Sequence, residues 1–236
     1  MPIRTDKDKL GLRRAVYGVE LLVSDALDAI SKSWTERLLP SLEKEHAHLE
    51  KWAEELEQEK ASIPDDFLTD DYAVIEETQH ILRALLTVGV YHVFEQHLVR
   101  FFYSWAQYYQ CKAPEDRKPT VHPTSCGCKP LKNPQLSDVV DSFKKAWAID
   151  LTKLTSYPKI NDELRLVANC VKHGEGGSCL QLEALHKDWF DPDHGVTPLS
   201  AHGLQIPADY LGQAVESVKS FLNELKAAID SAPTQA

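Results

Sequence analysis

The amino-acid sequence predicts an all-α protein, a helical bundle with a long first helix and a projecting charged helical segment. Only 10 of its 236 residues are glycine, although glycine is one of the residues that mark the turns of strand-rich folds. Apolar residues recur at spacings of three and four through most of the chain, which is the period of a helix with one face in a core. The composition, 43% hydrophobic and 26% charged, is that of a globular protein. We expect residues 1–236 to form a single domain.

The first helix is predicted over residues 10–39. Its apolar stripe consists of Leu12, Val16, Val19, Val23, Leu27, Ile30, Trp34 and Leu38. Pro40 interrupts this helix because proline has no N–H to donate and clashes with the preceding turn. Residues 40–66 continue a sparser stripe amid Glu and Lys. This pattern is typical of a projecting, partner-binding arm or of a solvated surface helix that rests on one neighbour.

The longest and most apolar helix is predicted over residues 71–109, as the central helix of the bundle, with a bend near Gly89. Residues 112–134 are rich in proline and predict a long loop. Beyond them we expect helices over residues 137–151 and 159–172, an irregular stretch to residue 206, and a last helix over residues 207–229.

Charge and cysteine content restrict the classes of function. Thirty-six acidic residues against 26 Lys and Arg give a formal charge of −10, so any contact with nucleic acid must use a local basic patch. No apolar stretch reaches the roughly 20 residues that cross a bilayer. The five cysteines are odd in number and lack the spacing of a disulfide framework. We therefore expect a cytoplasmic protein that does not bind membranes.

Two sets of residues have the chemistry of metal ligands. The first lies in and just before the 112–134 loop: Cys111, His122, Cys126 and Cys128. It lacks the second paired motif of a zinc site, and an unligated loop is the alternative interpretation. Glu77 and His80 have the Glu-x-x-His spacing of di-iron bundles, and ordinary charged surface is the alternative. We expect neither a metal nor a cofactor.

The segment from Asn161 to Gly174 contains the most informative pattern. At about 100° per residue, one arc of the predicted helix holds Arg165, Asn169, Lys172 and His173. The opposite arc holds Leu166, Val167, Ala168, Cys170 and Val171. Gly174 follows where a helix commonly ends in a left-handed residue, so the cations at this end either cap the helix or face a ligand.

The run from Leu164 to Gly174 resembles the signature helix of the HEPN superfamily, whose helical domains occur in toxin–antitoxin, abortive-infection and other antiphage systems. The stretch Tyr91 to Arg100 is similar to an earlier helix of these proteins, which often carries an aromatic residue and a Glu. The superfamily motif is an Arg, commonly followed by a polar residue such as Asn, and a His four to six residues after the Arg. Asn169 and His173 match this motif, whereas Ala168 stands in the place of the Arg.

The resemblance implies a bundle that dimerises through its central and signature helices and a metal-independent endoribonuclease that acts on RNA. It implies that His173 transfers a proton, because imidazole titrates close to neutral pH. Arg165 and Lys172 would stabilise the phosphorane, Asn169 would orient the phosphate or the imidazole, and Glu95 would pair with a cation or set the histidine tautomer. An antitoxin or another defence-system protein is the expected partner. The absent motif Arg leaves open a non-catalytic scaffold or sensor that binds a protein or a nucleotide.

Overall fold

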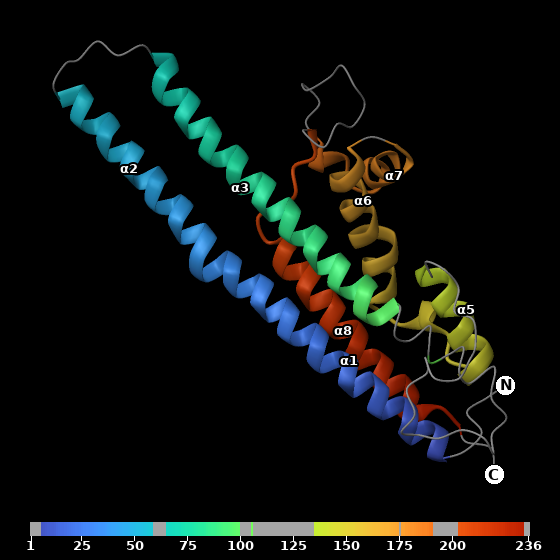
Figure 1. Ribbon diagram of the computed structural model, residues 1–236. Helices are drawn as coiled ribbons and strands as arrows, with labels where there is room; N and C mark the ends of the chain where they lie inside the picture. Colours follow the sequence, from blue (N-terminus) through green and yellow to red (C-terminus); the bar gives the residue numbers. More distant parts are fainter. Residues whose placement is uncertain are drawn as a thin grey trace. The chain divides into compact units, whose positions relative to one another are not determined.

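The computed structural model describes residues 6–58, 65–99, 105, 135–174, 176–190 and 203–233. Most of these residues are helical, which confirms the all-α prediction (Figure 1). The α-helices are α1 (Asp6–Ser33), α2 (Leu39–Gln58), α3 (Asp65–Val93), α5 (Leu136–Trp147), α6 (Arg165–His173), α7 (Gly177–Leu185) and α8 (Tyr210–Ser231). Within these described ranges, extended pairing is limited to one antiparallel bridge between Phe190 and Leu204.

The chain divides into two compact units, which are described separately. Unit 1 comprises Met1–Leu27, Val90–Leu166 and Gln213–Ala236, and unit 2 comprises Asp28–Gly89 and Val167–Gly212. The boundaries fall inside the helices α1, α3, α6 and α8. The single domain expected for residues 1–236 stays a prediction.

The core of unit 1 is formed by the apolar stripes of α1 and α8. Leu12, Val16, Val19, Val23 and Leu27 are all buried, as their spacing predicts. On α8 the buried side chains recur at the same helical period: Val218, Phe221, Leu222, Leu225 and Ile229. Phe221 packs edge-on against Phe94, with ring centroids 5.5 Å apart. The unit-1 parts of α1 and α8 lie side by side (Figure 1).

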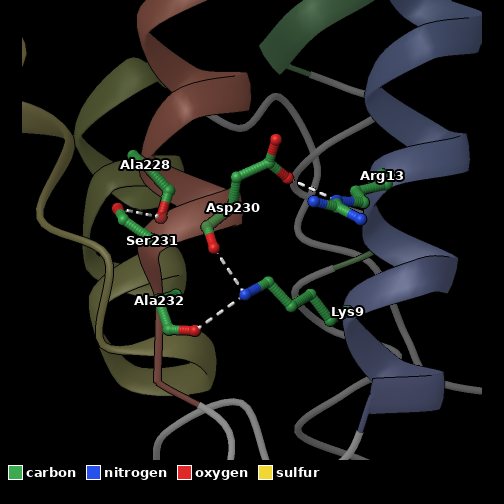
Figure 2. Close-up of polar contacts among 6 residues, drawn as sticks. All are labelled: Lys9, Arg13, Ala228, Asp230, Ser231 and Ala232. Atoms are coloured by element: carbon green, nitrogen blue, oxygen red, sulfur yellow. Dashed lines mark hydrogen bonds and ion pairs between the residues drawn. The ribbon is translucent and has the colours of Figure 1, made fainter.

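Polar contacts hold the end of α8 against the start of α1 (Figure 2). The Lys9 ammonium donates to the carbonyl oxygens of Asp230, at 2.6 Å, and Ala232, at 3.1 Å. Arg13 pairs with the Asp230 carboxylate. Since the last carbonyls of a helix have no partner within it, a cation at this end stabilises α8. Glu20 and Lys226 form an ion pair at 2.6 Å, later in α1 and earlier in α8 than the contacts of Lys9. The order of these contacts shows that the two helices are antiparallel.

The predicted interruption at Pro40 is a change of helical type. Trp34–Leu38 form a π-helical turn between α1 and α2, closed by the Leu39 N–H on the Trp34 carbonyl. Pro40 is then the second residue of α2. Proline is tolerated in a first turn because its missing N–H lies among those that an α-helix leaves unpaired. The helical path therefore continues past Pro40.

In unit 2, α2 and the first part of α3 run side by side (Figure 1). His46 of α2 contacts Tyr72 of α3, with ring centroids 5.1 Å apart. Desolvation raises the pKa of Tyr72, and the carboxylates of Glu50 and Glu54 on α2 add to the rise. Each helix thus covers one face of the other.

The central helix differs from its prediction in detail. Its α-helical pattern continues through Gly89, where a bend was expected, and changes to a π-helix at Phe94–Val99. The part predicted beyond Val99 lies outside the described residues, apart from the helical Trp105. The 112–134 loop lies wholly outside them.

The irregular stretch after α6 was predicted wrongly. Residues 174–206 were expected to be irregular, but Gly177–Leu185 form the helix α7. Gly176 and Gly177 lowered the expectation of a helix here, although glycine is well tolerated at the start of one. Burial of Cys179 and Leu182 favours α7, and such tertiary packing outweighs local propensity.

Asp150 gives the fold an acid-sensitive contact. Its carboxylate accepts hydrogen bonds from the Thr152 hydroxyl, at 2.6 Å, and the Lys144 ammonium, at 2.9 Å. These bonds lower the pKa of Asp150 to about 2. A carboxyl whose folded-state pKa is depressed stabilises the fold above its unfolded pKa of about 3.9 and loses that effect as pH falls towards 2.

We therefore expect Asp150→Asn to lower the urea midpoint at pH 7 and to have progressively less effect between pH 4 and pH 2. Urea unfolding of both proteins, followed by circular dichroism across this range, measures the difference. A difference in midpoint that stays constant with pH would show that the Asp150 carboxylate is not the group that titrates.

Candidate functional site

Helix α6 has the two faces that its sequence predicts, except that Val171 of the apolar arc is only half-buried. Leu166, Val167, Ala168 and Cys170 are buried. On the other face Asn169 is half-buried, and Lys172 and His173 are exposed. Residues four apart on a helix are neighbours on its surface, so Asn169 lies next to His173. The α6 polar face, defined as Asn169, Lys172 and His173, thus presents an amide, an ammonium and an imidazole to solvent.

Gly174 ends this helix directly after His173. Its φ of 69° is left-handed, and its N–H donates to the Cys170 carbonyl at 2.8 Å. Glycine adopts this conformation without the steric penalty of a Cβ. The predicted cap is confirmed, because the backbone N–H of Gly174 donates a hydrogen bond to one of the last carbonyl oxygens of the helix.

A disulfide joins the candidate helix to α7, beside it in Figure 1. Cys170 and Cys179 are bonded, with their Cα atoms 4.9 Å apart, and both side chains are buried. Sequence reasoning missed this pair because five cysteines without a repeated spacing allow many pairings. The useful signal was the short separation of nine residues across a glycine-rich turn. The cytoplasmic location stays a prediction.

Closing a loop of this size removes conformational freedom from the unfolded chain and stabilises a protein by about 2–3 kcal/mol. We expect 5 mM dithiothreitol to lower the free energy of unfolding by this amount. The Cys170→Ala/Cys179→Ala variant is the matched control, because its stability should not respond to the reductant. Five free thiols in the untreated, freshly purified protein, with stability insensitive to dithiothreitol, would contradict the expectation.

Glu95 and Arg165 both influence the pKa of Tyr91 in unit 1. Glu95 lies half-buried in the π-helix Phe94–Val99, and Arg165 directly follows a second π-helix, Lys159–Leu164. Burial raises the pKa of Tyr91 to about 12, the Glu95 carboxylate adds to the rise, and the Arg165 guanidinium opposes it. Tyr91 is therefore a neutral hydrogen-bonding group at pH 7.

Tyr157 also interacts electrostatically with Arg165 and Tyr91, and sequence reasoning missed it. Burial and the Asp162 carboxylate raise its pKa, while Arg165 lowers it. The Arg165 Nε donates to the Asn161 carbonyl at 2.9 Å, which fixes the start of its side chain. No spacing signal links Tyr157 to Tyr91, because 66 residues separate them in the chain.

The five candidate residues therefore fall into two groups. Asn169, Lys172 and His173 share the polar face of α6 within unit 2. Glu95 and Arg165 belong to unit 1 and share the neighbourhood of Tyr91. Arg165 is the first residue of α6 and His173 its last.

The metal-ligand candidates have different outcomes. Among the described residues, including Glu77 and His80, no three or more His, Cys, Asp or Glu side chains are grouped so that they can hold a metal ion. Cys111, His122, Cys126 and Cys128 lie outside the described residues.

Two further findings concern the kind of protein to which the chain belongs. Across the part of the chain that the structure describes, no helix has the length and apolar character needed to cross a membrane. Comparison with protein-family models, curated proteins and solved structures finds no match to this chain.

Proposed function

We propose that this protein is a HEPN-like, metal-independent endoribonuclease of a stress or antiphage defence system. The observation that carries the proposal is the polar face of α6, where an exposed His173 stands one turn from Asn169 beside the exposed Lys172. This face has the residue types that RNA cleavage through the 2′-hydroxyl needs, and it is open to solvent. Lys172 supplies one cation on this face, in a chain whose overall formal charge is −10 and whose contact with RNA must therefore be local.

In the proposed reaction the ribose 2′-oxygen attacks the adjacent phosphorus, so that an O2′–P bond forms and the P–O5′ bond breaks. The 2′-hydroxyl loses its proton and the departing 5′-oxygen gains one. His173 performs one of these two transfers. The products are an RNA fragment ending in a 2′,3′-cyclic phosphate and a fragment with a 5′-hydroxyl.

The other residues of the site supply charge and orientation. Lys172 stabilises the negative charge that develops on the phosphorane, and Asn169 orients the phosphate or the imidazole. Within unit 1, Arg165 is the second cation that the resemblance implies, and Glu95 is its proposed partner. Neutral Tyr91, between the influences of Glu95 and Arg165, is suited to hold these two side chains in position.

The test is to incubate the purified full chain with total cellular RNA in 10 mM EDTA. The expected result is a set of fragments that a ligase specific for 2′,3′-cyclic phosphate ends can capture. Cleavage that disappears in EDTA and returns with magnesium would contradict the proposal, because no residue of this face requires a metal. Intact RNA at the highest protein concentration would favour the alternative below.

The alternative is a HEPN-like scaffold or sensor that binds a protein or nucleotide without cleaving RNA. The burial of Ala168 favours it, since this residue stands in the place of the motif Arg and is 0% exposed. A side chain at position 168 therefore does not reach solvent. Catalysis would therefore depend on Lys172 or Arg165 to replace the missing charge.

We further propose that the active form is a homodimer in which two copies of α6 line one cleft, and that an antitoxin or another defence-system protein controls it. Sedimentation velocity of the purified chain tests the dimer. Toxicity on expression in bacteria, relieved by co-expression of a neighbouring gene product, tests the controlling partner.

A further inference from the structure

One face of α3 exposes an apolar stripe that its own unit does not cover. Val74, Ile81 and Leu85 are 62%, 45% and 55% exposed. At about 100° per residue they lie within roughly 40° of one another on the helix. The α3 stripe, defined as these three residues, therefore spans about 17 Å along the helix at 1.5 Å per residue. Glu77 and Thr78 lie near it in the turns between Val74 and Ile81.

The opposite side of α3 is already occupied within unit 2. Tyr72 contacts His46 of α2, and Arg83 lies over the ring of Trp34, 5.6 Å from its centroid. The Arg83 guanidinium also donates to the Ile206 carbonyl at 3.1 Å. The stripe is thus on the face of α3 that points away from α2, Trp34 and Ile206.

Carboxylates border the stripe. Asp70 and Glu77 fall on one side of it and Asp71 on the other, each within about 60° around the helix. They belong to a strongly acidic region: residues 39–80 contain 13 Asp and Glu against 3 Lys, whereas the other 194 residues contain 23 acidic and 23 basic residues. The whole formal charge of −10 therefore resides in residues 39–80.

We infer that the α3 stripe is a docking surface for a cationic amphipathic helix of a partner protein. Apolar side chains of the partner would cover Val74, Ile81 and Leu85, and flanking Lys or Arg would meet Asp70, Asp71 and Glu77. RNA does not fit this surface, because its phosphates would meet the most acidic part of the chain.

A second copy of the chain is also a poor occupant. A two-fold interface brings the same patch of both subunits together, so the acidic borders of the two stripes would face each other. Like charges that are brought together in this way oppose association. A basic partner converts the same carboxylates into favourable contacts.

The test uses a synthetic helical peptide of about 14 residues, long enough to cover the stripe, with leucines on one face and lysines on both flanks. A second peptide carries glutamate in place of lysine, and binding to the full chain is measured by fluorescence anisotropy. We expect the lysine peptide to bind at least about tenfold more tightly than the glutamate peptide. Raising NaCl from 50 to 500 mM should weaken its binding about fivefold or more.

Two variants locate the binding. Ile81→Ser/Leu85→Ser should weaken binding of the lysine peptide at least about tenfold, because it removes two of the three apolar side chains of the α3 stripe. Asp70→Lys/Glu77→Lys should reverse the preference in favour of the glutamate peptide. Tyr17→Ser/Leu21→Ser is the matched control, since it removes two comparably exposed apolar side chains, 60% and 48%, from α1. Circular dichroism and melting temperature establish that each variant is folded.

The inference is overturned if the two peptides bind equally, or if the Tyr17→Ser/Leu21→Ser control loses as much affinity as the α3 variant. It is also overturned if the wild-type chain is a dimer that Ile81→Ser/Leu85→Ser converts to a monomer, because the stripe then belongs to the contact between copies. These readouts do not involve RNA cleavage, so they stand or fall independently of the nuclease proposal.

Discussion

His173→Ala is expected to lower kcat/KM for RNA cleavage by about 100- to 10,000-fold, the range that one positioned acid–base group contributes. The imidazole is exposed on the last turn of α6, directly before the left-handed Gly174. Because this side chain is not part of the buried core, the variant should keep its melting temperature. The rate is measured with a fluorescent RNA oligonucleotide in EDTA, under single-turnover conditions.

His48→Ala is the matched control, because it removes another exposed imidazole, from α2. Its cleavage rate should equal that of the wild type. If both variants lose activity together, or if His173→Ala retains full activity, the polar face of α6 is not the catalytic site. A mock purification from cells that do not express the protein is assayed in parallel, so that cleavage by a contaminating nuclease is subtracted before the variants are compared.

Ala168→Arg is expected to destabilise the protein by about 4 kcal/mol or more and to leave RNA cleavage no faster than in the wild type. The substitution restores the superfamily motif in sequence, but Ala168 is completely buried, as are its neighbour Val167 and the disulfide-bonded Cys170. A guanidinium there must displace packed side chains and lose its hydration without a partner. Urea unfolding at pH 7 measures the loss.

Lys172→Arg provides the matched control on the same helix. It places a guanidinium on the exposed face of α6, where we expect a change in stability within about 0.5 kcal/mol. If Ala168→Arg is as stable as the wild type and cleaves RNA faster, position 168 opens onto the site, and the motif was lost by substitution alone.

The local features of the fold were predictable from the sequence. The apolar stripe of α1, the left-handed Gly174 and the two faces of α6 all follow from the period of an α-helix and from the conformational freedom of glycine. The interruption predicted at Pro40 was not found, because the helical path continues through a π-helical turn into α2. What the confirmed features share is that neighbouring residues decide them.

The grouping of the candidate residues was not predictable in the same way. Tyr91 comes together with Tyr157 and Arg165, which belong to one segment much later in the chain. Glu95 lies within one π-helix, Phe94–Val99, and Arg165 directly follows another, Lys159–Leu164. The Cys170–Cys179 bond needed a helix, α7, that its glycine-rich start concealed. Spacing within one segment contains no information on the contact of Tyr91 with the segment that holds Tyr157 and Arg165, whereas the short separation of the two cysteines was a local signal.

The sequence by itself determined that this protein is helical, that one short helix carries an amide, an ammonium and an imidazole on one side, and that its negative charge is concentrated in residues 39–80. Only the tertiary structure decided which apolar residues are buried and which, like Val74, Ile81 and Leu85, remain exposed. The physical reason is that helical period and charge are local properties of the chain, whereas burial depends on which distant segments pack against each face.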